Sequence, residues 1–296
     1  MSSFSVVRLR KVWFGLSIIM IGLSLGALFG WGLRFGIDFT GGSLMAFRFE
    51  TRPSSAVLTE TLRNTNADLA SAVLQPVGEQ EVQIRTKQIS QKTYESLLAT
   101  LSSKHGNVTG LRFDTFDPLI GKELRTKSLQ GVIVALLLIV AYIAFVFRKV
   151  SAPIVSWKYG VVTMLAALHD VLVPLGVFAW LGHTRGIEVG TPFVAAMLTI
   201  LGYSITDTIV VMDRVRENLP RMKALFDEVV DVALRQTFLR SLYTSFSTLI
   251  TLTAIFLFGG TSLHEFTLAM IIGIVTGTYS SIFIAPTLLV AWNKIK

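Results

Sequence analysis

The sequence contains no cysteine, so no disulfide can stabilise an exported part of the chain, and the redox compartment cannot be inferred. It also lacks the phosphate loop G-x-x-x-x-G-K-[ST], the dinucleotide fingerprint G-x-G-x-x-G and the zinc motif H-E-x-x-H. The histidines are not spaced as metal ligands; they are His105, His169, His183 and His264. An ATPase or a metalloprotease would need a site that this chain lacks. We therefore expect a protein that is not an enzyme and that binds no cofactor or metal.

Apolar residues, by contrast, are in excess: 52% of the 296 residues are hydrophobic and the mean hydropathy is +0.61. A helix needs about 20 apolar residues to cross about 30 Å of hydrocarbon at about 1.5 Å per residue. Six stretches meet this length, at residues 12–33, 129–147, 159–181, 192–212, 242–258 and 266–292. The sequence therefore predicts a polytopic α-helical membrane protein with six transmembrane helices.

Basic residues are distributed unevenly between the segments that join these helices. The N-terminus, segments 148–158 and 214–240 and the C-terminal end together hold 14 lysines and arginines, whereas the short loops opposite hold only Arg185. Because positively charged loops stay in the cytoplasm, we expect both termini to be cytoplasmic. The first apolar stretch is too long for the core of a cleaved signal peptide, so we expect it to be retained. Orientation also explains the net charge of +8, and we expect no nucleic acid partner.

A polar insert separates the first two predicted membrane helices and divides the chain into segments 1–33, 34–128 and 129–296. The predicted orientation makes residues 34–128 extracytoplasmic. Patterns typical of strands (43–50, 70–77, 81–89, 107–116) and helices (54–64, 91–105) alternate in the order β-α-β-β-α-β, which predicts a ferredoxin-like α+β domain. Ser54 or Ser55 is suited to cap the first of these helices, and Gly106 to end the second.

The segment 219–240, before the fifth predicted membrane helix, is basic and amphipathic. Its apolar residues share one side of a helix: Met222, Leu225, Phe226, Val229, Val230, Ala233 and Leu234. This pattern predicts a separate helix lying along the cytoplasmic membrane interface.

Glycines at helical spacing mark two faces where another helix could approach closely. The first face belongs to the first predicted membrane helix and holds Gly15, Gly22, Gly26 and Gly30; the second belongs to the sixth and holds Gly273 and Gly277. Small residues permit close backbone contact in membranes. The two interpretations are packing within the bundle of this chain and docking of a separate membrane subunit.

Asp207 is one of two acidic residues well inside the predicted membrane helices. A charge near the hydrocarbon core costs several kcal/mol, so such residues commonly have a function. Burial disfavours the charged form of a carboxyl group, which suits a residue that takes up and releases a proton. Tyr203 and Ser204 lie within about one turn, and their hydroxyls could hold a file of water molecules. The alternative is a structural carboxyl that bonds a neighbouring helix.

Asp170 is the second such residue and follows His169. Pro174, four residues later, has no N–H, so the carbonyl of residue 170 loses its helical partner and a kink is expected. A freed carbonyl beside a carboxyl and an imidazole is a place for water, and we expect Asp170 and His169 to belong, with Asp207, to the proton-coupling residues. A purely structural kink is the alternative.

Arg240 begins the fifth predicted membrane helix, and a stripe of Thr244, Thr248 and Thr251 follows it. One interpretation is a hydrated path facing Asp207, in which Arg240 would hold the aspartate ionised. The other is an arginine that extends to anionic lipid headgroups.

Three motifs carry a resemblance to a known family: Gly36-Ile37-Asp38-Phe39-Thr40-Gly41-Gly42, Gly202-Tyr203-Ser204-Ile205-Thr206-Asp207, and Gly277-Thr278-Tyr279-Ser280-Ser281. In this order and at these distances they resemble the SecD/SecF family of protein-export membrane subunits, which belongs to the resistance-nodulation-division superfamily. From the residues alone, Gly36, Gly41 and Gly42 give backbone freedom for a tight turn, and Asp38 or Thr40 can bond local N–H groups.

The resemblance implies that Asp207 is the membrane carboxylate of the family and that Arg240 is its paired arginine. It implies coupling of the proton-motive force to preprotein translocation across the cytoplasmic (inner) membrane. The implied partners are SecD, the SecYEG channel, YajC and YidC, a translocating preprotein and membrane lipids.

Two other functions compete with this one. Half of a small-molecule or lipid transporter of the same superfamily would usually carry larger paired extracytoplasmic modules than an insert of 95 residues. A scaffold of the translocon that conducts no protons would not need Asp207.

Overall fold

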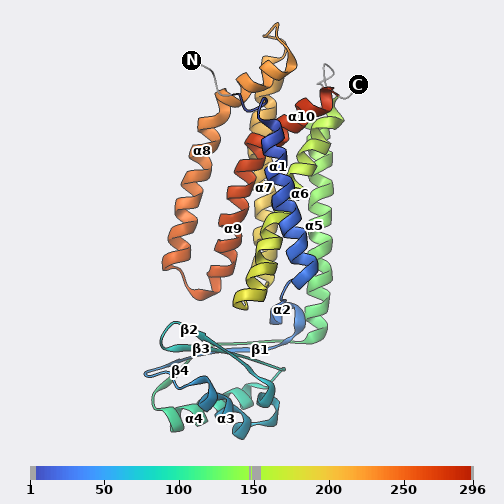
Figure 1. The fold of residues 1–296 in the computed structure, drawn as a ribbon. Coiled ribbons are helices and arrows are strands. Elements are labelled where there is room, and N and C mark those ends of the chain that lie inside the picture. Colours follow the sequence, from blue (N-terminus) through green and yellow to red (C-terminus); the bar gives the residue numbers. More distant parts are fainter. Residues whose placement is uncertain (1–4, 147, 149–154, 295–296) are drawn as a thin grey trace. The chain divides into compact units, whose positions relative to one another are not determined.

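The computed structural model describes residues 5–146, 148 and 155–294. The chain forms two compact units, one of Phe35–Ser128 and one of Met1–Arg34 together with Leu129–Lys296. The first unit is an α+β module and the second a bundle of long helices (Figure 1). Most of the predicted cytoplasmic loop 148–158, and residue 147 at the predicted end of the second membrane helix, lie outside the described residues.

The α+β module contains one antiparallel sheet of four strands, β1 (Gly42–Phe49), β2 (Val73–Val77), β3 (Glu81–Thr86) and β4 (Val108–Phe116). The strands lie in the order β2-β3-β1-β4. Helices α3 (Ser55–Thr65) and α4 (Gln91–His105) both cover one face of this sheet (Figure 1). This β-α-β-β-α-β arrangement confirms the predicted ferredoxin-like domain between the first two membrane helices.

The core of the module lies between the sheet and its two helices, where apolar residues of β1 and β3 meet one side of α3 and α4: Met45, Phe47, Phe49, Ile84, Leu58, Leu62, Leu97 and Leu101. Ser54 begins α3 as predicted, because its side chain accepts a hydrogen bond from the backbone N–H of Val57. Gly106 follows α4 with φ +80°, a backbone angle that favours glycine.

The second and third strands are shorter than predicted. Residues Ala67–Ser71 form a short 3-10 helix, η1, because the Asn66 side chain accepts a hydrogen bond from the N–H of Asp68 at 2.9 Å and sets a turn. Strand β3 stops at Thr86, and beyond it the N–H of Ile89 donates to Ser43 Oγ at 3.0 Å. Side-chain hydrogen bonds therefore replace ladder bonds at both places.

The glycine motif after the first membrane helix forms a four-residue helix, α2 (Ile37–Thr40), and then enters β1. Gly41 and Gly42 have φ +74° and +122°, and a Cβ at Gly41 would lie 2.5 Å from Pro118 Cα. Gly36 has φ −72°, which any residue can adopt. The hydroxyl of Thr40 donates to the carbonyl of Gly36 at 3.0 Å. Asp38 lies in the first turn of α2.

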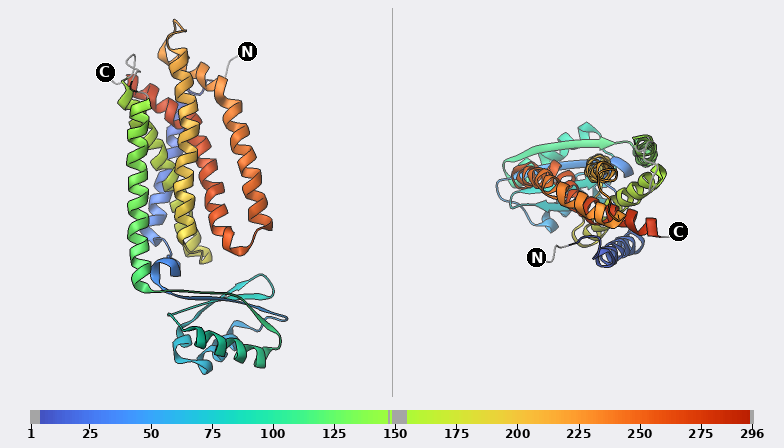
Figure 2. Two further views of the ribbon diagram at one scale, coloured as in Figure 1. Left: turned by 180° about the vertical axis from the view of Figure 1, so that it is seen from behind. Right: turned by 90° about the horizontal axis from the view of Figure 1, so that it is seen from above.

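Six helices are long and apolar enough to cross a membrane, as predicted. They are α1 (Arg10–Trp31), α5 (Pro118–Val146), α6 (Ser156–Arg185), α7 (Thr191–Asn218), α8 (Phe226–Phe258), and a last span in which α9 (Thr261–Tyr279) continues through the π-helix η2 (Ser280–Ile284) into α10 (Ala285–Lys294). Figures 1 and 2 show these helices running side by side, with α5 and α8 at opposite edges of the bundle. The chain is a multi-pass membrane protein.

Helices α5 and α8 begin more than two turns before their apolar stretches. Helix α5 starts at Pro118 and not at residue 129, because the Asp117 carboxylate accepts a hydrogen bond from the N–H of Leu119 at 2.8 Å and caps it. The segment 219–240 is not a separate interfacial helix. From Phe226 onward it is the first part of α8, which contains no proline or glycine. Its apolar side packs against Val211 and Val215 of α7 instead of lying on a membrane surface.

The most deeply packed helices are α6, α7 and the last span, whereas most of α1, α5 and α8 is exposed on the bundle surface. Helix α1 lies along α6, where a Cβ at Gly176 would come within 2.3 Å of Ser24 Cα. Helix α7 packs against both α8 and α9, and a Cβ at Gly273 would be 2.2 Å from Ile200 Cδ1. Close approach of α7 and α9 brings together the polar residues described next.

Candidate functional site

Asp207 is buried on α7, with 7% of its surface exposed. The groups that act on its carboxylate come from α8: Ser241, Arg240 and Ser245. Asp207 Oδ2 and the Ser241 hydroxyl are both buried and make no well-aligned hydrogen bond in the described part of the chain, although Ser241 and Ser245 lie close enough to the carboxylate to act on it as donors. Unpartnered buried oxygens are uncommon in proteins and call for an explanation, such as a role in binding protons.

Arg240 is exposed on α8 and acts on Asp207 through its charge. Among the described residues, no ion pair joins the two side chains. The arginine therefore favours the ionised aspartate without being locked to it.

The predicted threonine stripe does not face Asp207. Thr244 and Thr251 are exposed. Each of the three threonine hydroxyls donates to the backbone carbonyl one turn earlier in its own helix. The bonds are Thr244 to Arg240 at 2.9 Å, Thr248 to Thr244 at 3.0 Å and Thr251 to Ser247 at 3.1 Å. The buried hydroxyls of α8 are those of Ser241 and Ser245. The stripe prediction was wrong because both sets have helical spacing, and sequence spacing alone does not say which side of the helix is buried.

Ser245 links three helices beside Asp207. Tyr203 of α7 donates to its hydroxyl at 3.3 Å, and Thr278 of α9 donates to it at 2.6 Å. This hydroxyl cluster ties the Asp207 region to the end of α9.

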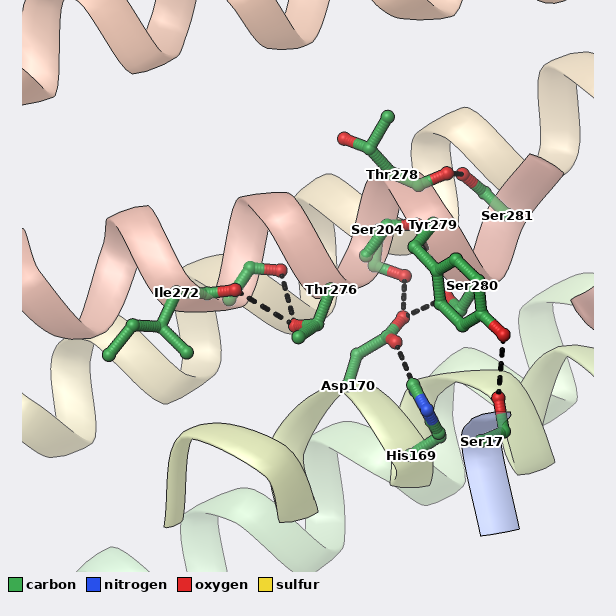
Figure 3. A network of polar contacts seen from close by, with 12 residues as sticks. Ser17, His169, Asp170, Ser204, Ile272, Thr276, Thr278, Tyr279, Ser280 and Ser281 are labelled. Atoms are coloured by element: carbon green, nitrogen blue, oxygen red, sulfur yellow. Dashed lines mark hydrogen bonds and ion pairs between the residues drawn. The ribbon is translucent and has the colours of Figure 1, made fainter. Parts of the chain in front are cut away.

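The second buried carboxylate, Asp170, lies near the middle of α6 and is completely buried. Its Oδ1 lies 2.9 Å from His169 Nδ1, and its Oδ2 accepts hydrogen bonds from Ser204 of α7 and, at 2.5 Å, from Ser280 of η2 (Figure 3). Three helices therefore meet at one carboxylate. Ser204 therefore serves Asp170 and not Asp207, although it lies within one turn of Asp207 in the sequence.

The backbone is irregular at this second centre. Pro174 stands inside α6, four residues after Asp170, and Pro286 follows η2, where the N–H of Ala285 bonds the carbonyl of Ser280 across a π-turn. Proline has no N–H for the carbonyl of Ile282, which accounts for the wider turn. Tyr279, just before η2, donates to the carbonyl of Trp13 at 2.8 Å and so connects α1 to the same region.

The glycine faces have different surroundings. A Cβ at Gly277 would lie 3.1 Å from Ser204 Cβ, so the sixth-helix glycines pack within the bundle. A Cβ at Gly15, Gly22, Gly26 or Gly30 would meet no atom within 4 Å. In the described chain, the glycine face of α1 therefore contacts no other helix.

Sequence reasoning missed three hydroxyl residues of these sites, Ser245, Thr278 and Ser280. Thr278 and Ser280 stood in a quoted motif without an assigned role. Ser241 and Ser245 are one helical turn apart, and the neighbouring threonines Thr244 and Thr248 have the same spacing, so the sequence did not distinguish the two sets.

The chain matches two family models. Residues 96–295 match the model "Protein export membrane protein SecD/SecF, C-terminal", and residues 17–51 match the model of the SecD/SecF GG motif. The second model contains the turn of α2 and β1, and the first contains both buried carboxylates.

Curated relatives cover nearly the whole chain. The protein translocase subunit SecF of Thermobaculum terrenum is 41% identical over 98% of this chain and 94% of its own length, and that of Pseudomonas aeruginosa is 33% identical over 98% and 92%. The SecDF subunit of Thermus thermophilus is 35% identical over 94% of this chain, which spans only 37% of that longer protein. These relatives are translocase subunits, which have a transport function.

Solved structures show the same fold. The crystal structure of SecDF from Thermus thermophilus, described as a translocon-associated membrane protein, matches 98% of this chain with a TM-score of 0.85 and 34% identity. A structure of SecDF in a super-membrane-facing form matches with a TM-score of 0.69 at the same identity and covers 99% of this chain. This chain spans 38% and 39% of those two solved chains.

Proposed function

Because the chain belongs to the SecD/SecF family of protein-export membrane proteins, we propose that it couples the proton-motive force to preprotein translocation across the cytoplasmic (inner) membrane. A role in Sec-dependent protein export follows from the family. The proposal adds the energy source and the residues that use it, with Asp207 as the principal proton-binding group.

One observation supports the proposal most strongly: Asp207 is buried inside a membrane helix, its Oδ2 makes no well-aligned hydrogen bond in the described chain, and Ser241, Ser245 and Arg240 of α8 are near enough to act on it without an ion pair. A carboxylate in this setting can lose and regain a proton as the arginine moves nearer or farther away. One charge crossing 100 mV gains about 2.3 kcal/mol, which can drive a change between two helix arrangements.

We propose SecD and the SecYEG channel as partners, with YajC and YidC as further subunits and the preprotein and membrane lipids as ligands. Two features support SecD. First, some relatives are longer SecDF proteins, and this chain matches only part of their length. Second, the glycine face of α1 contacts no other described helix. In membranes such a face permits close packing of another helix.

We place both termini in the cytoplasm and the segment 34–128 outside it. The start of α1 and the end of α10 lie at the same end of the bundle (Figure 1), as an even number of spans requires. The excess of basic residues then sets which side this end faces.

The functional test compares two aspartates of α7. Asp207→Asn removes a titratable group with little change of shape, whereas Asp213→Asn, its matched control, alters a half-buried residue that pairs with Arg216 at 3.4 Å. In inverted vesicles containing the Sec machinery, Asp207→Asn should abolish stimulation of export by an imposed gradient, and Asp213→Asn should keep it. Gradient-stimulated export by Asp207→Asn at normal abundance would favour the scaffold function.

The partnership is tested separately by affinity capture of the detergent-solubilised chain. SecD and the channel subunits should be recovered together with it. Recovery of neither from cells that make both would contradict the assignment of partners.

A further inference from the structure

Asp170 and its hydrogen-bond partners form a second buried polar site, to which the function proposed for Asp207 assigns no part. Asp170 is fully buried, and in the described chain no lysine or arginine pairs with it. Its partners are two serine hydroxyls and the adjacent His169. A buried carboxylate without a basic partner other than histidine stays charged only while these hydrogen bonds hold it.

The hydrogen bonds of Asp170 join separate helices through one oxygen atom. Ser204 on α7 and Ser280 on η2 both donate to Oδ2, so an ionised Asp170 on α6 holds α7 and the last span together (Figure 3). Hydrogen bonds to a charged acceptor are roughly twice as strong as neutral ones. The contact between the three helices therefore depends on the charge of one carboxylate.

Ser280 has a second acceptor already in reach. Its hydroxyl lies 3.2 Å from the carbonyl of Gly277 in α9, within its own span. Ser280 is also the first residue of the π-turn η2, and π-turns of this kind are frequent at functional sites. The last span can thus exchange its bond to α6 for a bond within itself.

The remaining titratable groups near Asp170 can be named for each packed helix. Helix α6 contributes His169. Helix α9 contributes Tyr279, whose ring centroid lies 6.1 Å from that of His169. Helix α7 carries Asp207, three residues beyond Ser204. Helix α1 approaches with the uncharged Ser17, which donates to Tyr279 at 3.3 Å. The Nε2 atom of His169 is buried and has no partner among the described residues, so it is a group through which a proton can pass.

We propose that Asp170 is a second proton-binding site of the membrane domain and that Ser280 transmits its protonation state to the last membrane span. At acidic pH a hydronium ion gives one proton to Oδ2 and leaves as water, which turns the carboxylate into a neutral acid whose O–H becomes a donor. Oδ2 then no longer accepts both serine hydrogens, and Ser280 turns to the carbonyl of Gly277. This inference deepens the proposed proton coupling and rests on it, but it concerns residues other than Asp207 and Arg240.

Infrared difference spectroscopy of the full chain in lipid, recorded between acidic and alkaline pH, tests the proton-binding step. A protonated-carboxyl band should disappear in Asp170→Asn, shift in Asp170→Glu and persist in Asp207→Asn. If the spectrum of Asp170→Asn retains every carboxyl band of the unmodified protein, Asp170 does not change protonation and the inference is overturned.

Distances between spin labels at Glu217 of α7 and Asn293 of α10 test transmission to the last span. We expect the distance distribution to change with pH in the unmodified protein and in Ser281→Ala, and to lose that change in Ser280→Ala. Ser281 is the matched control, because it lies in the same π-turn and its hydroxyl bonds, among the described residues, only the carbonyl of Thr278, at 3.2 Å. An equal pH response in the two serine variants would contradict the role of Ser280.

These readouts are separate from the test of Asp207. If export by Asp207→Asn keeps its full response to the gradient while the Asp170 band and the distance change persist, the coupling proposal fails and the second site stands. If Asp207→Asn loses gradient-dependent export but Asp170 never titrates, the coupling proposal stands and the second proton-binding site fails.

Discussion

The contact between Gly273 of α9 and Ile200 of α7 offers a quantitative test of how the bundle is packed. A Cβ placed at Gly273 would lie 2.2 Å from Ile200 Cδ1, 2.4 Å from Cγ1 and 2.8 Å from Cγ2. Ile200 is fully buried, so it has little space into which to move. Gly273→Ala must therefore push α7 and α9 apart or force Ile200 off its preferred rotamer.

Overpacking of this kind costs about 1–3 kcal/mol. In a domain of roughly this size, each kcal/mol lowers the melting temperature by about 2–4 °C. The matched control is Gly22→Ala on α1, where a Cβ meets nothing within 4 Å. It should leave stability unchanged or raise it slightly, because alanine is about 0.5–1 kcal/mol better than glycine inside a helix.

The assay is thermal unfolding of the detergent-solubilised protein, with Ile200→Ala as a second variant. Ile200→Ala alone should cost about 2–5 kcal/mol, since it leaves a cavity. In the double variant the new methyl group occupies part of that cavity, so the combined loss should be smaller than the sum by about 0.5–3 kcal/mol. Equal melting temperatures for Gly273→Ala and Gly22→Ala, or strict additivity in the double variant, would refute the packing described for α7 and α9.

Three further predictions concern topology, partnership and the α+β module. Single cysteines at Ser103 and Thr184 should react with an impermeant thiol reagent added outside cells, and one at Ala224 should not; outside labelling of Ala224 would invalidate the orientation. Gly22→Leu combined with Gly26→Leu should lower recovery of SecD, whereas Leu23→Ala, a change to a smaller side chain at an exposed position outside the glycine face, should not. Unchanged recovery in the double variant would assign the glycine face to lipid. Ser54→Ala should destabilise the module by about 1 kcal/mol in chemical unfolding through loss of the α3 cap, and Thr59→Ala, which removes only a bond to the helix backbone, should cost less.

Three features could be predicted because each rests on a pattern with a single physical meaning. They are the number of membrane helices, the ferredoxin-like order of strands and helices, and the identity of the buried acidic residues. A run of about 20 apolar residues has few uses other than spanning a membrane. Strand and helix periods in the insert, with Ser54 and Gly106 at helix ends, left one plausible arrangement. A charged residue within an apolar run is conspicuous for the same reason, as Asp207 and Asp170 show.

The errors arose where one pattern fits two structures. The apolar side of 226–234 suits a membrane surface or a neighbouring helix, and only the presence of Val211 and Val215 on α7 decides between them. Serine and threonine on α8 are equally spaced, so the sequence could not tell which hydroxyls face Asp207. The partnership of Ser204 and Ser280 at Asp170 depends on how three helices pack, which no single segment encodes.

If Asp207 is the principal proton-binding group, protons should pass through this protein by way of Asp207. Proton flux can be measured into vesicles that contain the chain together with SecD, using a pH-sensitive dye enclosed inside. Under an imposed pH difference, flux should fall to the level of empty vesicles in Asp207→Asn, partly recover in Asp207→Glu, which keeps a titratable carboxyl, and remain unchanged in Asp213→Asn. Equal flux through the unmodified protein and Asp207→Asn, with equal protein content, would contradict the account.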